Sequence, residues 1–147
     1  MLSRILIFGF ATLFFINTST AQTEVSWGDL MDITFKDVYL ESDDIYVYFP
    51  LFKEKQKVLS EKEVSITGYI IPIDVEMNLY VLSAFPFSAC FFCGAAGPES
   101  VMAVYFESDD LSFRTDDRLT LTGSFELNDS DVNELIYILR DAEVKNM

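Results

Sequence analysis

The stretch that decides the fold is "VSITGYIIPI", residues 64–73. Its side chains alternate, so that Val64 and Ile66 belong to one face, and the other face has Ser65, Thr67 and Tyr69. A period of two residues is typical of a half-buried β-strand. A glycine inside such a strand, here Gly68, indicates a bulge or a sharp bend. The stretch therefore predicts a strongly bent strand.

Four more strand patterns follow it, at residues 79–85, 100–106, 119–127 and 135–144. One of them, "LTLTGSFEL", repeats the alternation around a second glycine, Gly123. Five strands with glycine bends fit a small antiparallel barrel of the oligonucleotide/oligosaccharide-binding (OB) type. A β-sandwich is the alternative, but it needs about seven strands. We therefore expect a mainly β protein, a small five-stranded OB-like antiparallel barrel with an irregular N-terminal extension.

The first 21 residues have the composition of a secretory signal peptide. Arg4 precedes an apolar run at 5–16, and small residues lead to Ala21. The run is shorter than the roughly 20 residues that span a bilayer. We expect cleavage after Ala21, a periplasmic or secreted protein, and no stable membrane insertion afterwards.

The chain then divides into three expected parts. These are the signal peptide at 1–21, an N-terminal extension packing on the barrel at 22–60, and the OB-like barrel at 61–147. Within the extension, a short helical turn is expected around Trp27, and the run at 45–52 is strand-like until Pro50 ends it. No linker or repeat interrupts the sequence.

The charge of the chain excludes one class of partner. The formal net charge is −14, and Arg4 is the only charged residue of the first 21, so the mature protein is more acidic still. A phosphate backbone would be repelled by such a field. We therefore expect no nucleic-acid partner.

Both cysteines lie in "ACFFCGAAGPES", residues 89–100. In an extended chain, positions i and i+3 are about 10 Å apart, whereas a disulfide needs α-carbons within about 4.4–6.8 Å. Cys90 and Cys93 must therefore sit in a turn if they act together, between the second and third strands. The residues that predict this turn are Gly94, Gly97 and Pro98.

The chemistry of the pair stays open at this point. An oxidising compartment favours a disulfide. A Cys-x-x-Cys pair is also half of a zinc or other transition-metal site, for which Glu99 is a possible third ligand. A thiol–disulfide redox role is a third alternative, but such a motif belongs at a helix N-terminus. Two unpaired, buried thiols that serve only in packing are the fourth. The sequence contains no histidine, so Ser-His-Asp and Cys-His catalysis are excluded, and no catalytic residue is predicted.

Several of these segments together resemble the DUF3299 family of small exported bacterial proteins of unknown function. They are "WGDL" at 27–30, "VSITGYIIPI" at 64–73, the stretch 79–106 and "YILRDAEV" at 137–144. In one form of the family motif, a histidine follows the cysteine by two residues, but Phe92 stands there in this chain. The resemblance implies an exported accessory protein, in some cases beside transporter components of the ABC type.

The sequence thus predicts an exported binding or accessory module that serves an envelope protein or a transporter, rather than an enzyme. A small metal-binding protein that uses the Cys90–Cys93 turn is the alternative. Aromatic residues gather at 46–52 and 85–92. They indicate core packing or, alternatively, an exposed groove for a peptide or partner.

Overall fold

The computed structural model of the chain describes residues 22–41, 44–94, 96–108 and 111–145. The expected signal peptide at 1–21 lies outside the described residues. The elements are β1 (Thr23–Glu24), α1 (Trp27–Leu30), β2 (Thr34–Leu40), β3 (Ile45–Leu51), α2 (Glu54–Lys57), β4 (Lys62–Asp74), β5 (Leu79–Ser83), three short 3₁₀ helices η1 (Phe87–Ala89), η2 (Phe91–Cys93) and η3 (Pro98–Ser100), β6 (Val101–Phe106), β7 (Arg118–Leu127) and β8 (Tyr137–Val144).

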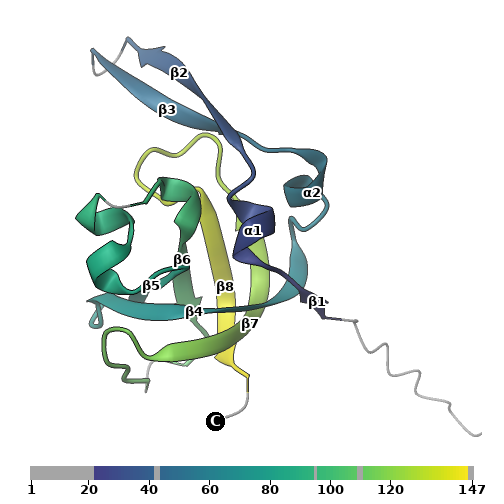
Figure 1. Ribbon diagram of the computed structural model, residues 1–147, viewed down its shortest axis with the longest axis vertical. Coiled ribbons are helices and arrows are strands. Elements are labelled where there is room, and N and C mark those ends of the chain that lie inside the picture. Colours follow the sequence, from purple (N-terminus) through teal and green to yellow (C-terminus); the bar gives the residue numbers. More distant parts are fainter. Residues whose placement is uncertain (1–21, 42–43, 95, 109–110, 146–147) are drawn as a thin grey trace, which may run out of the picture.

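The last five strands form a closed barrel (Figure 1). Their order is β4–β5–β6–β8–β7, and β7 pairs again with β4, which closes the sheet. The β6–β8 pair is parallel, and the other pairs in the barrel are antiparallel. The expected small OB-like barrel is confirmed, because each of its five predicted strands is present in the predicted order.

Two glycines lie where the barrel strands come closest together. A Cβ atom at Gly68 would lie 2.7 Å from the carbonyl oxygen of Ser83 and 2.8 Å from Leu82 Cγ. A Cβ at Gly123 would lie 2.6 Å from the carbonyl oxygen of Arg140, beside a register shift between β7 and β8. Both predicted strand bends are therefore sites where only a hydrogen atom fits.

The barrel core is filled from inside and closed by the N-terminal segment. Leu30 of α1 is fully buried, and its carbonyl accepts a hydrogen bond of 2.6 Å from the Tyr137 hydroxyl. Trp27 Nε1 donates to the carbonyl of Thr67 over 2.9 Å, and the indole packs on the core. Burial, followed by the negative charge of Glu99, raises the pKa of Tyr137. The helical turn predicted around Trp27 thus anchors the extension to the barrel.

The N-terminal extension is more regular than expected. β2 and β3 form an antiparallel hairpin, paired from Thr34↔Leu51 to Leu40↔Ile45, which projects away from the barrel (Figure 1). The expectation of an irregular extension was wrong for these residues, and β2 was not predicted. Pro50 does not end the strand as expected, since β3 continues to Leu51 and belongs to a two-stranded sheet with open edges. Proline is tolerated at a sheet edge because its missing N–H faces away from the partner strand.

We expect Gly68→Ala to lower the free energy of unfolding by more than about 1 kcal/mol, because the added methyl group would collide with the Ser83 carbonyl. Gly28→Ala is the matched control, since a Cβ there meets nothing closer than Ser26 Oγ at 3.7 Å. Urea denaturation of both variants measures the difference. Equal stability of the two variants would contradict the role assigned to Gly68.

Candidate functional site

Strand β5 is apolar on both of its faces. Tyr80 and Leu82 point into the main core. Val81, between them, belongs to a second, smaller hydrophobic cluster on the outer face of the barrel. A strand that is apolar on both faces is covered on both sides. The outer face of β5 is therefore a place where the barrel contacts something other than water.

Part of this outer face is covered by the segment that carries the cysteines. Cys90 is fully buried there, in the second cluster with Ile71, Val81 and Val101. Phe91 packs against the same cluster. Cysteine often serves as a small apolar residue in such positions, so Cys90 helps to hold η1 and η2 on the barrel.

Cys93 has a different environment from Cys90. Its thiol is exposed, is not bonded to Cys90, and donates a hydrogen bond of 2.9 Å to the carbonyl of Phe87. Partial desolvation of the sulfur, followed by the effect of the nearby Cys90 thiol, raises the pKa of Cys93. A raised pKa leaves less thiolate near neutral pH, which is opposite to the environment of a redox-active cysteine.

Glu99 does not join the two cysteines. Its carboxylate folds back over Gly97, where a Cβ would lie 2.3 Å from both oxygens, and its charge acts on Tyr137. Within the described ranges, no three Cys, Asp or Glu residues come together in a way that could hold a metal ion. The third metal ligand expected at Glu99 is thus not brought to the pair.

The predicted turn between the second and third strands is present but longer than a simple turn. Gly94 ends η2 in the left-handed conformation with φ of 71°, which glycine adopts without strain. Gly97 has ordinary backbone angles and precedes Pro98, which begins η3. The three residues therefore act at two separate bends within the segment.

Beside this covered area the outer face remains open as a groove of about 240 Å³. The groove is mostly apolar, and its walls come from the end of β4, from β5 and β6, from η2, and from the loop between β7 and β8. Its lining residues are Ile73, Leu79, Val81, Phe92, Ala103, Tyr105, Val132, Asn133, Glu134 and Leu135. Sequence positions far apart thus meet in one concave surface.

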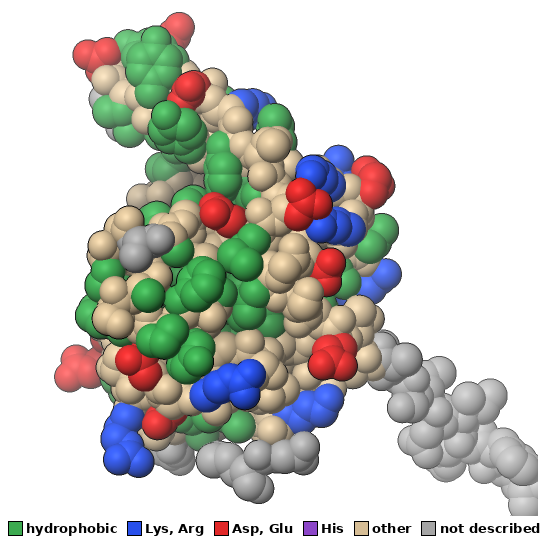
Figure 2. Space-filling view, in the orientation of Figure 1, with side chains coloured by type: hydrophobic (Ala, Val, Ile, Leu, Met, Phe, Trp, Pro, Cys, Tyr) green, Lys and Arg blue, Asp and Glu red, His purple; other side chains and the backbone are tan. Residues whose placement is uncertain are grey.

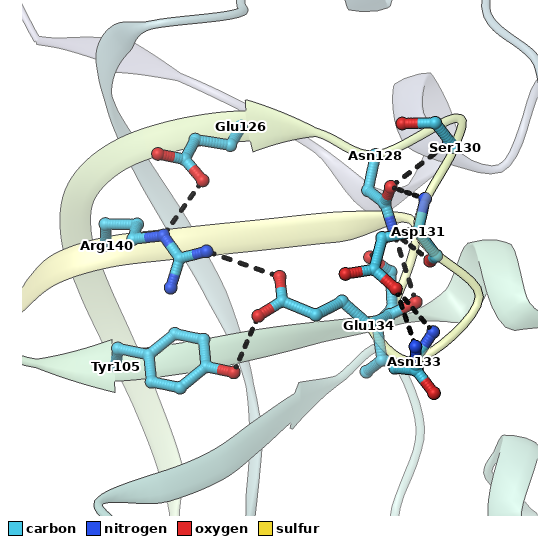
Figure 3. Close-up of polar contacts among 9 residues, drawn as sticks. Tyr105, Glu126, Asn128, Ser130, Asp131, Asn133, Glu134 and Arg140 are labelled. Atoms are coloured by element: carbon cyan, nitrogen blue, oxygen red, sulfur yellow. Dashed lines mark hydrogen bonds and ion pairs between the residues drawn. The ribbon is translucent and has the colours of Figure 1, made fainter.

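A chain of polar contacts forms one rim of the groove (Figure 3). The Tyr105 hydroxyl donates to Glu134 over 3.2 Å, and Arg140 contacts Glu134 at 3.2 Å and Glu126 at 2.9 Å. The Arg140 guanidinium also lies 4.7 Å from the centre of the Tyr105 ring, a cation–π distance. These contacts hold the Tyr105 ring and the Glu134 carboxylate in fixed positions on adjacent elements.

The ionisation of these groups reflects their mutual contacts. Burial alone would lower the pKa of Arg140, but the hydrogen bond and charge of Glu126 and the charge of Glu134 raise it. Burial, followed by the charge of Glu134, raises the pKa of Tyr105. Arg140 therefore stays cationic and Tyr105 stays neutral, so the rim offers a carboxylate whose charge is only partly balanced by one shared arginine.

The loop that supplies the far wall, residues 128–136, is held by Asn128. The side-chain oxygen of Asn128 accepts from the backbone N–H groups of Ser130 and Asp131, and its amide donates to the carbonyls of Asp131, Glu134 and Leu135. Figure 3 shows this amide at the centre of the loop. The Asn128 side chain thus helps to fix the backbone that places Val132 and Glu134 at the groove.

The groove residues other than Phe92 were not predicted as a site. The signal that points to them is the absence of alternation in "LYVLS" (79–83), where both faces are apolar. This pattern shows that the outer face of the strand is covered. It does not show by what, because the covering residues come from distant segments.

No family model, no curated protein and no solved structure matches the chain at a significant level. The resemblance to the DUF3299 family therefore stays a prediction from the sequence.

We expect the two thiols to react at very different rates with iodoacetamide in the reduced, native protein. Cys93 should be alkylated slowly near neutral pH and faster as the pH rises toward its raised pKa, while the buried Cys90 should react only after unfolding. Mass spectrometry of digested samples measures each site, and Cys93→Ser should leave no thiol that reacts in the native state. Rapid alkylation of both cysteines would contradict this assignment.

Proposed function

We propose that this protein is an exported binding module and that its ligand lies in the groove between β5, β6 and the 128–136 loop. The observation that carries the proposal is the position of the groove. In OB barrels the ligand lies on the face of strands two and three, between the loops that follow strands one and four. Here those strands are β5 and β6, Ile73 lies at the end of strand one, and Val132–Leu135 belong to the loop after strand four.

The chemistry of the groove favours a ligand with apolar side chains and a cationic or neutral polar group. The floor is aliphatic, with Leu79, Val81 and Ala103, and the rim presents the Glu134 carboxylate. The net charge of −14 repels polyanions, so the nucleic acids that many OB barrels bind are disfavoured. A peptide segment with alternating apolar and basic residues meets these requirements.

The export and accessory parts of the proposal rest on the sequence. Residues 1–21 have the composition of a signal peptide. No helix in the described part of the chain is long and apolar enough to cross a membrane. An association with a transporter of the ABC type or with another envelope protein is supported by the DUF3299 resemblance.

No specific observation favours metal binding or a redox role for Cys90 and Cys93. A metal site at Cys90 and Cys93 would need two further ligands, which a second copy of the chain would have to supply. A redox role would need a lowered thiol pKa, whereas that of Cys93 is raised. We therefore assign the Cys-x-x-Cys segment a structural role, since it seats Phe92 at the groove.

Selection of decapeptides from a random phage-displayed library against the purified protein tests the groove. We expect Val132→Lys to weaken the selected peptides by about tenfold or more, because it removes apolar contact area and adds a positive charge that repels the basic side chains of the ligand. Val58→Lys is the matched control, since Val58 is 53% exposed and Val132 50%, but Val58 lies at the end of α2 and does not line the groove. Fluorescence anisotropy gives the affinities. If no peptide is selected, or if both variants bind equally well, the proposal is wrong.

A further inference from the structure

The β2–β3 hairpin, residues 34–51, which we call the arm, has the side chains of an interaction surface. Because cross-strand partners share a face, the register places Tyr39 opposite Tyr46 and Asp37 opposite Tyr48 on one face. Tyr46 and Tyr48 are 71% and 69% exposed. Figure 2 shows hydrophobic side chains along the arm with acidic ones at its tip. Exposed tyrosines are typical of binding surfaces, because they offer large contact areas at a small entropic cost.

The arm also has free strand edges. Among the described residues, β2 and β3 pair only with each other, so the outer edge of each strand is unpaired. An isolated two-stranded sheet is marginally stable, and an exposed apolar edge is prone to pair with other chains. The unpaired N–H and C=O groups of such an edge add no hydrogen bonds within the chain, so the edge is better explained as a place where a partner pairs.

The base of the arm is fixed rather than loose. Gln56 of α2 is fully buried, and its amide donates to the carbonyls of Asp29 and Asp32, which precede the arm. Its side-chain oxygen accepts from the backbone N–H of Lys53, which follows the arm. The Asp32 carboxylate pairs with Lys53 and with Lys55, and hydrogen bonds from these two lysines lower its pKa to about 2. The two ends of the arm are thus clamped together, which presets its direction.

The arm and the groove adjoin each other. A depression between them is lined by Val47–Pro50 of β3 and by residues of the 128–136 loop. Val132 and Glu134 line both the depression and the groove. The loop is therefore a shared wall, and the surface continues from the groove across Val132 to Tyr48, halfway along the arm.

The charge of this surface selects its partner. The arm contains four acidic residues, Asp37, Glu41, Asp43 and Asp44, against the single basic residue Lys36. Asp131 and Glu134 lie in the loop, and Arg140 is shared between Glu126 and Glu134. A second copy of this chain would bring the same negative charge, so like-charge repulsion disfavours it.

We propose that an extended, basic segment of another polypeptide pairs with the free edge of β3 and continues over Val132 into the groove. This inference rests on the proposed function, since it assigns the ligand of the same groove. Strand addition to a free edge supplies main-chain hydrogen bonds, and the alternating side chains of the added strand reach the surfaces beside it. Apolar side chains would lie against Tyr48 and Val81, and lysine or arginine side chains beside Glu134.

Synthetic peptides of alternating leucine and lysine test this inference. A peptide of about 6 residues spans roughly 20 Å and can fill the groove alone, whereas one of about 12 residues spans roughly 40 Å and can reach the arm as well. We expect the long peptide to bind at least about tenfold more tightly. Tyr48→Ser should remove most of this gain and leave the affinity of the short peptide unchanged, while Val58→Ser should change neither. Hydrogen exchange of the backbone amide of Tyr48 should slow when the long peptide binds, because its N–H points to the same free edge as the Pro50 nitrogen.

The outcomes separate the two proposals. If the short peptide binds and its affinity is lowered by Val132→Lys, but the greater length brings no gain, the groove stands and the role of the arm is overturned. If neither peptide binds, the proposed function falls too. A leucine–glutamate peptide that binds equally well would overturn the basic character of the partner. N-methylation of the long peptide at alternate residues removes the N–H groups that edge pairing needs, so unchanged affinity would overturn edge pairing. If sedimentation shows a dimer that Tyr48→Ser dissociates, the arm binds a second copy of the chain and the proposal is wrong.

Discussion

The whole structure depends on the close approach of β4 to its neighbours at Gly68. β4 pairs with β7 along its first part and with β5 along its second, and the two pairings meet at Tyr69. To serve both neighbours, the strand has to coil sharply, and the Ser83 carbonyl then lies where a side chain at Gly68 would be. A sheet closes on itself only when its strands coil, and glycine bends such as the one at Gly68 allow this coiling. Closure removes the edges of the main sheet.

The inner and the outer surface of the barrel differ in what their side chains contact. The inner one is filled by side chains such as Leu82, Leu121 and Phe125, all fully buried. The outer face of β5 and β6 is apolar as well, which a small barrel does not need for its own stability. One part of it is covered by the 84–100 segment through Cys90 and Phe91. The remainder is the groove, so the same apolar face both seats a structural segment and leaves room for a ligand.

Three side chains hold the parts of this surface in place. Asn128 holds the 128–136 loop, Arg140 fixes the Glu134 carboxylate, and Gln56 clamps the base of the arm. Groups that are held before a ligand arrives lose little conformational entropy on binding. The acidic character of the loop and arm adds long-range attraction for a basic partner. Fold and charge thus act on the same surface.

By itself, the sequence determined the barrel and the place of the cysteine turn, because both follow from local patterns. Alternation in "VSITGYI" and "LTLTGSF" marks strands, the interior glycines mark their bends, and Gly94 marks a turn. Only the tertiary structure decided that Cys90 is buried while Cys93 is exposed, that the Glu99 carboxylate folds back over Gly97, and that the β2–β3 hairpin stands away from the barrel. Periodicity states which side chains share a face, but what covers that face depends on segments distant in sequence. The groove, assembled from β4, β5, β6, η2 and the 128–136 loop, is therefore a property of the folded chain alone.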